Sequence, residues 1–144
     1  MNPRRPRAYI GIKFHSDDRN RESIEVLSEA LASCGYETVC VRPDVEEWGA
    51  VTLAPRELMA KTFEIIRACQ LVVIDLSEKG VGLGIEAGYA YAQGVPVFTV
   101  AREGTDVSDT LRGISRDVFL YRSAADLRGF FAQLVIEDAT EEGR

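Results

Sequence analysis

The feature that most constrains the fold of this chain is the apolar run Leu71–Leu76 (LVVIDL), which leads through a glycine-bearing turn into a helix of small residues. Its continuous apolar character is typical of a central parallel strand that is covered on both faces. The turn contains Gly80, Gly82 and Gly84, which permit positive φ and a close approach of the backbone to a ligand. A strand that leads through such a turn into a helix is the repeating unit of α/β proteins.

The rest of the chain alternates strand and helix patterns of similar length. Further strands are predicted at 8–14, 36–41, 95–100 and 118–121. Helices are predicted at 19–34, 55–69, 82–93 and 109–114, and after Ser123, whose spacing to Asp126 resembles a capping box. Residues 42–54, which include Trp48, are predicted to form a long polar connection. This pattern predicts an α/β, flavodoxin-like three-layer sandwich with a five-stranded parallel sheet, order 2-1-3-4-5, and helices on both faces.

Length and composition limit the classes of function. We expect residues 1–144 to form one domain, with flexible tails at 1–7 and 137–144. A net charge of −6 argues against nucleic acid as a partner, since such affinity comes mainly from Lys and Arg. No apolar run approaches the ~20 residues of a membrane span, and no signal-type segment is present, so a cytoplasmic location is expected. The three cysteines show no metal-ligand spacing, and neither a metal nor a cofactor is expected.

Glu86 is the first candidate for chemistry. It is predicted to lie in the first turn or so of the 82–93 helix, where the helix dipole stabilises an anion, so we expect an ionised carboxylate. Ligands of such sheets bind at the switch between strands one and three, here at the loops after Phe14, Leu76 and Val100. A helix-start charge beside a tightly packed helix explains Glu86 equally well. A phosphate loop fits less well, because GVGLGIE matches neither G-x-G-x-x-G nor the P-loop pattern.

A longer motif narrows these alternatives. VGLGIEAGYAYAQGVPV resembles the signature of the nucleoside 2-deoxyribosyltransferase superfamily, and the matching positions are Gly82, Gly84, Glu86, Gly88, Ala90, Gly94 and Val97. Tyr9-Ile10-Gly11 resembles the Tyr-x-Gly of that family, and the resemblance continues in register from about residue 8 to 135. It implies that Glu86 is a nucleophile at C1′ of a sugar and that Tyr9 lies against it.

One branch of that family, the 2′-deoxynucleoside 5′-monophosphate N-glycosidases, shares a second segment with this chain. Ser108-x-x-Leu111-Arg112-Gly113 resembles it, which implies that Ser108 reaches the substrate phosphate of a neighbouring subunit. The chain also departs from the family. Gly80 stands where transferases carry Asp and N-glycosidases tend to carry Ser, and Thr62 stands where an Asp usually handles the nucleobase.

The reaction implied is hydrolysis of the N-glycosidic bond of a (deoxy)nucleoside 5′-monophosphate through a glycosyl-enzyme on the glutamate. The alternatives are a nucleoside 2-deoxyribosyltransferase that exchanges bases, a non-catalytic nucleotide-binding module, and a structural domain. A homodimer or higher homo-oligomer with shared sites is expected, without membrane partners. The candidate catalytic residues are Glu86 and Tyr9, and the candidate substrate-binding residues are Gly11, Lys13, His15, Arg19, Asp75, Ser77, Gly80, Gly82, Gly84, Ser108 and Arg112.

Overall fold

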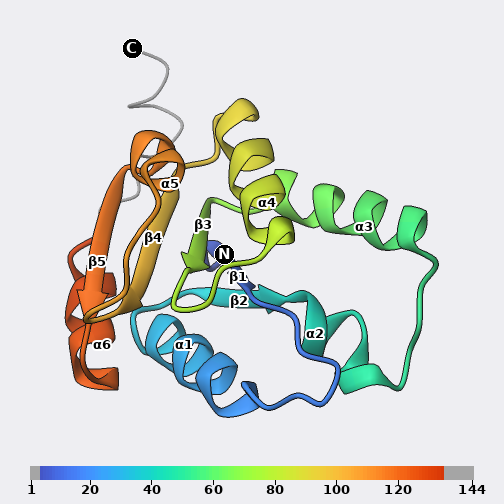
Figure 1. Cartoon of the computed structure of the whole chain (residues 1–144), viewed down its shortest axis with the longest axis horizontal. Coiled ribbons are helices and arrows are strands. Elements are labelled where there is room, and N and C mark those ends of the chain that lie inside the picture. The colour runs from blue at the N-terminus through green and yellow to red at the C-terminus, as the bar shows by residue number, and fades with distance from the viewer. Residues whose placement is uncertain (1–3, 135–144) are drawn as a thin grey trace.

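A computed structural model describes residues 4–134 of the chain. Within them, parallel strands form a five-stranded sheet in the order β2-β1-β3-β4-β5 (Figure 1). The strands are β1 (Arg7–Ile12), β2 (Glu37–Cys40), β3 (Leu71–Asp75), β4 (Val97–Arg102) and β5 (Asp117–Tyr121). The predicted fold class and strand order are confirmed.

Helices cover both faces of this sheet. The helices are α1 (Arg21–Ser33), α2 (Val41–Asp44), the short 3-10 helix η1 (Glu47–Gly49), α3 (Pro55–Arg67), α4 (Val81–Ala92), α5 (Asp109–Ile114) and α6 (Ala124–Ala132). One core lies between the sheet and α1 and α6, and the other between the sheet and α3, α4 and α5. No helix among residues 4–134 combines the length and the apolar character that crossing a bilayer requires.

Strand β3 lies at the centre of the sheet, and all its residues are buried there. Strand β1 shows how alternate side chains serve the two cores. Ala8 and Ile10 pack towards α1 and α6, whereas Tyr9 points towards α3 and α4. The period of two in β1 therefore brings the tyrosine hydroxyl to the face on which α4 carries Glu86.

The structure departs from the predicted limits of several elements. The polar connection at 42–54 contains α2 and η1, and Glu47, Trp48 and Gly49 all have positive φ. Strand β4 begins two residues later than predicted, because the N–H of Val95 still bonds the carbonyl of Ala90 in α4 and Pro96 has no N–H. Strand β1 begins at Arg7, inside the predicted N-terminal tail, whereas 1–3 and 137–144 lie outside the described residues.

The cap of α6 is confirmed in part. The hydroxyl of Ser123 accepts a hydrogen bond from the N–H of Asp126 at 3.2 Å, as an N-cap does. The carboxylate of Asp126, however, accepts from the N–H of Arg122 at 2.8 Å. The reciprocal bond of a capping box is thus displaced by one residue.

A buried hydrogen bond joins the central strand to the edge of the sheet, and its removal should be measurable. The hydroxyl of Tyr121 donates to Asp75 Oδ2 at 2.7 Å, and both side chains are buried. Tyr121→Phe should lower the free energy of unfolding by about 1–2 kcal/mol, because a buried carboxylate oxygen loses its partner. Urea unfolding measures this loss. Tyr36→Phe is the control, because Tyr36 is also a buried tyrosine but its hydroxyl makes no hydrogen bond within the described residues; an equal loss in both variants would contradict the assignment.

Candidate active site

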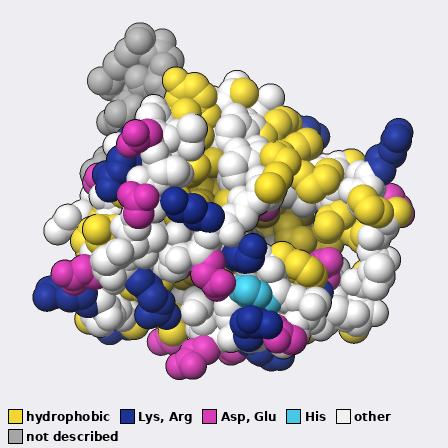
Figure 2. Space-filling view, in the orientation of Figure 1, with side chains coloured by type: hydrophobic (Ala, Val, Ile, Leu, Met, Phe, Trp, Pro, Cys, Tyr) yellow, Lys and Arg dark blue, Asp and Glu magenta, His cyan; other side chains and the backbone are white. Residues whose placement is uncertain are grey.

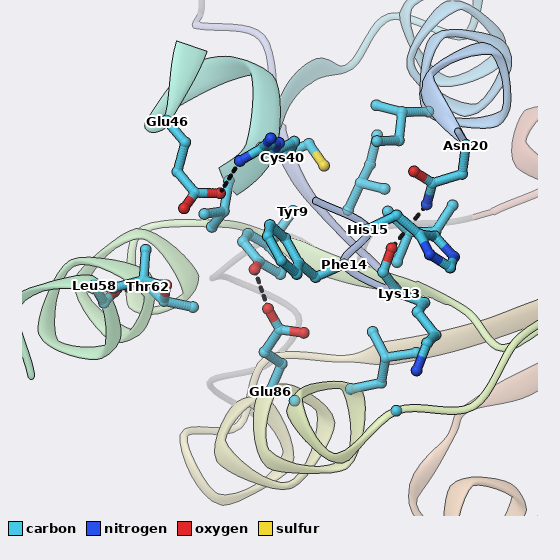
Figure 3. Close-up of a pocket in the computed structure, with 18 of the residues that line it drawn as sticks. Tyr9, Lys13, Phe14, His15, Asn20, Cys40, Glu46, Leu58, Thr62 and Glu86 are labelled. Carbon is cyan, nitrogen blue, oxygen red and sulfur yellow. Dashed lines mark hydrogen bonds and ion pairs between the residues drawn. The ribbon is translucent and has the colours of Figure 1, made fainter. Parts of the chain in front are cut away.

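A cavity of about 440 Å³ opens at the carboxyl ends of β1 and β2 (Figure 3). Its walls come from the loop after β1, the segment after β2, α3 and the start of α4. The loop after β1 was a predicted part of the site, and Gly80 comes from the loop after β3. The loop after β4 contributes no lining residue within 4–134; the segment after β2 takes its place. The cavity therefore lies closer to β2 than the predicted position at the switch point.

Tyr9 and Glu86 meet in the middle of this cavity. The hydroxyl of Tyr9 donates a hydrogen bond to Glu86 Oε1 (Figure 3). Gly11 makes this approach possible, because a Cβ there would lie 3.2 Å from Glu86 Oε2 and 2.7 Å from Ile74 Cδ1. Glu86 Oε2 accepts no hydrogen bond from any residue between 4 and 134. The carboxylate thus has one oxygen fixed by the tyrosine and one directed at the cavity.

The electrostatic state of Glu86 differs from the prediction. Its side chain is half-buried, and this burial raises the pKa of Glu86 to about 7, although the hydrogen bond from Tyr9 opposes the rise. Glu86 is the sixth residue of α4, beyond the first turn in which the helix dipole acts strongly. The expectation of a fully ionised carboxylate is therefore wrong: near neutral pH, Glu86 exists in both protonation states.

The hydroxyl of Tyr9 remains a hydrogen-bond donor over the whole physiological range. Burial, and then the charge of Glu86, raise the pKa of Tyr9 well above its usual value of 10.0. A tyrosine that holds its proton can donate to the carboxylate continuously. It fixes the orientation of Glu86 and is not itself a base.

Basic and polar side chains gather on one side of this pair. Lys13, His15 and Asn20 lie together there (Figure 3), and Gly80 lies against the Lys13 side chain. His15 Nε2 lies 3.0 Å from Glu78 Oε1, and Asn20 Nδ2 donates to the carbonyl of Lys13 at 2.7 Å. These contacts hold the loop after β1 in place and leave the Lys13 ammonium beside the glycine turn.

The structure does not bring every predicted site residue to this cavity. Those outside its lining are Gly11, which lies behind the Glu86 carboxylate, and Arg19, Asp75, Ser77, Gly84, Ser108 and Arg112. Arg19 pairs with Asp17 at 3.0 Å on the surface. Asp75 is buried, where it accepts hydrogen bonds from Tyr121 and from the N–H of Ser77 at 2.8 Å. Its contacts therefore stabilise the end of β3 and the turn that follows it.

Sequence reasoning missed the contribution of the segment after β2. Arg42 and Glu46 line the cavity from there, opposite Leu58, Met59 and Thr62 of α3. The Thr62 hydroxyl donates to the carbonyl of Leu58 at 2.8 Å, so its hydrogen is used within its own helix. The one available signal was the concentration of charged residues around Trp48, which is equally typical of a solvated loop.

The glutamate motif resembles that of the nucleoside 2-deoxyribosyltransferase superfamily, and known proteins are similar to this chain in sequence or in fold. No model of a known protein family matches the chain. A curated protein of Thermofilum pendens, provisionally named 2′-deoxynucleoside 5′-phosphate N-hydrolase 1, is 25% identical over 128 residues, or 84% of this chain and 87% of that protein.

Solved structures agree with this relative. The CMP N-glycosidase of Clostridium botulinum has a TM-score of 0.59 at 19% identity and covers 86% of this chain and 96% of its own. The 2-deoxyribosyltransferase of Bacillus psychrosaccharolyticus has a TM-score of 0.67 at 16% identity and covers 85% and 90%. These two likenesses show the fold, and together with the curated relative they confirm the resemblance to the superfamily.

The raised pKa of Glu86 predicts a specific pH dependence of stability. As the pH rises from about 4.5 towards 7, the unfolded chain releases the Glu86 proton before the folded protein does, so this group progressively destabilises the fold. Glu86→Gln, which keeps an acceptor for Tyr9, should therefore be more stable than wild type at pH 8, by about 2 kcal/mol. Thermal unfolding at pH 8 and pH 4.5 tests this. The difference should nearly vanish at pH 4.5, and a difference of the same size at both pH values would contradict the assignment.

Proposed function

We propose that this chain is an enzyme that hydrolyses the N-glycosidic bond of a (deoxy)nucleoside 5′-monophosphate, with Glu86 as the nucleophile. The observation that carries the proposal is the hydrogen-bonded Tyr9–Glu86 pair at the centre of a cavity with a basic end. A volume of about 440 Å³ lies within the usual range of small-molecule sites. Lys13 supplies the positive charge that a phosphate requires, and His15 lies beside it in the lining.

The proposed reaction has two steps. Glu86 Oε2 attacks C1′ of the sugar, the C1′–N bond breaks, and the base leaves with the bonding electron pair and takes a proton from water. A water molecule then attacks C1′ of the glycosyl ester, gives up a proton, and releases the sugar phosphate and the free carboxylate. Tyr9 holds Oε1 throughout, so that Oε2 faces the sugar.

The names of the relatives support the coarser part of this proposal, a reaction at the N-glycosidic bond of a nucleoside or nucleotide. Two features of this chain favour hydrolysis of a monophosphate. Gly80 leaves the cavity without the acidic side chain that transferases carry at that position, and Lys13 occupies the space beside it. A carboxylate there would lie against the phosphate end and would repel the substrate.

Assays of base release test the proposal directly. Wild type should release free base from deoxynucleoside 5′-monophosphates, and Glu86→Gln should reduce the rate at least about 10³-fold, because the nucleophile is lost. Wild-type kcat/KM should rise with pH through about 7, since only the ionised carboxylate attacks. Glu64→Gln, an exposed change on α3 outside the cavity, is the control and should keep full activity.

Three outcomes would contradict parts of this assignment. Equal rates for wild type and Glu86→Gln would remove Glu86 from the reaction. A new nucleoside, formed when a second base is added, would indicate transfer in place of hydrolysis. Tight nucleotide binding with no release of base would indicate a non-catalytic module.

We also propose that the protein is a homodimer or higher homo-oligomer whose sites are shared. Apolar side chains gather over α3 and α4 (Figure 2), and Val81 and Ile85 of α4 are exposed, at 83% and 46%. Val81 also lines the cavity, so the exposed apolar surface reaches its mouth. Ser108 lies outside the cavity of its own chain, as a residue that serves a neighbouring subunit would.

Light scattering tests the oligomer. Wild type should have the mass of two or more chains, whereas Ile85→Glu should shift it towards the monomer, because a charge cannot be buried there without a partner. Base release should fall in parallel, since each site would lose its neighbour. A monomeric wild type with full activity would contradict the shared site.

A further inference from the structure

Among residues 4–134, the end of the cavity opposite Lys13 and His15 has one carboxylate in its lining, that of Glu46. In Figure 3 Glu46, Leu58 and Thr62 lie on one side of the Tyr9–Glu86 pair, and Lys13 and His15 lie on the other. The side chain of Glu46 is only 14% exposed. The remaining wall at this end is largely apolar, because α3 contributes Leu58 and Met59.

The backbone holds Glu46 firmly. Its N–H donates to the carbonyl of Val41 at 3.0 Å, and its carbonyl accepts from Gly49 at 2.9 Å and from Val51 at 3.0 Å. The next residues, Glu47 and Trp48, have φ values of 48° and 56°, a conformation that side chains disfavour. Tertiary contacts maintain this conformation, and strain of this kind is commonly found at ligand sites.

Trp48 supplies one of those contacts. It packs against the core beneath α1, and the Arg21 guanidinium lies 4.3 Å from its ring centroid. The tryptophan does not line the cavity. Its contacts with the core and with Arg21 anchor the segment. The strained turn is thus fixed on the outside, and Glu46 is presented on the inside.

Arg42 holds the Glu46 carboxylate in place. Its guanidinium lies 3.6 Å from Glu46 and donates to Asp18 at 2.6 Å and to the carbonyl of Ser16 at 3.3 Å. Gly49 leaves room for this arrangement, because a Cβ there would lie 2.9 Å from Arg42 Nη2. Held in this way, the carboxylate oxygens of Glu46 can accept hydrogen bonds from a ligand in the cavity.

We propose that Glu46 contacts the nucleobase and selects bases that present an exocyclic amino group. The inference rests on the proposed function: with the phosphate at Lys13 and C1′ at Glu86, the base extends to the Glu46 end. An amino group can donate to the carboxylate, whereas a base without one leaves a largely buried acceptor without that hydrogen bond. Thr62 does not offer the base a hydrogen-bond donor, because its hydroxyl hydrogen is directed to the carbonyl of Leu58.

The test compares matched ligands in a background without turnover. In Glu86→Gln, calorimetry measures the binding of dCMP and of the corresponding 2-pyrimidinone deoxynucleotide, and of dAMP and the corresponding unsubstituted purine deoxynucleotide. In at least one pair, the nucleotide with the amino group should bind about tenfold or more tightly than the nucleotide without it. Adding Glu46→Ala should reduce that ratio to within about twofold. Glu46→Gln keeps the shape of the side chain and should also reduce the ratio. It takes the place of the alanine variant if the folding of that variant is impaired.

The control is Glu47→Gln, the neighbouring exposed acid outside the cavity, which should preserve the ratio. An unchanged preference in both Glu46 variants, or no preference in the Glu46-intact protein, would overturn the role of Glu46. Base release by wild type, measured separately, decides the proposed function. A preference that depends on Glu46, without any turnover, would support base recognition by Glu46 and contradict the proposed enzymatic function.

Discussion

The close approach of α4 to β1 is the constraint on which this site depends. Gly11 has no side chain, so Ile74 and the Glu86 carboxylate can both lie close to β1, 2.7 Å and 3.2 Å from the position that a Cβ would take. The period of two in β1 then places Tyr9, two residues earlier, on the same face as that carboxylate. The absence of a side chain at Gly11 thus leaves room for the Tyr9–Glu86 pair at a place where burial raises the pKa of Glu86.

The two ends of the cavity differ in charge because they come from different loops. The loop after β1 brings Lys13 and His15, and the segment after β2 brings Arg42 and Glu46. Arg42 directs its charge to Asp18 and Glu46, so the Lys13 end keeps the available cation. A ligand with an anionic group at one end and a hydrogen-bond donor at the other fits this asymmetry.

The sequence predicted the fold well because its signals are local and redundant. The apolar run of β3 and the regular alternation along the chain give the sheet order, and helix α5 has the predicted limits, Asp109–Ile114. The Tyr9–Glu86 pair was expected from the resemblance, and the structure brings the two side chains together. Gly11 was a candidate as well, although its role as space for a carboxylate became evident only in three dimensions.

The parts that were missed depend on tertiary contacts. The turn at Glu47–Gly49 has positive φ throughout because Trp48 is anchored under α1, and residue propensities within 42–54 give no indication of this. The pKa of Glu86 is set by burial, which position in the helix does not reveal. Arg42 and Glu46 are ordinary charged residues in the sequence, and they become site residues only because the segment folds back over the end of β1.

The central claim is that the Glu86 carboxylate forms a bond to C1′, and mass spectrometry of the intact protein tests it most directly. A 2′-fluoro-arabino nucleoside 5′-monophosphate, whose fluorine slows the second step, should add the mass of one sugar phosphate per chain. Peptide mapping should place that adduct on Glu86, and Glu86→Gln should form none. An adduct on another residue, or base release from this substrate without any adduct on wild type, would contradict the account.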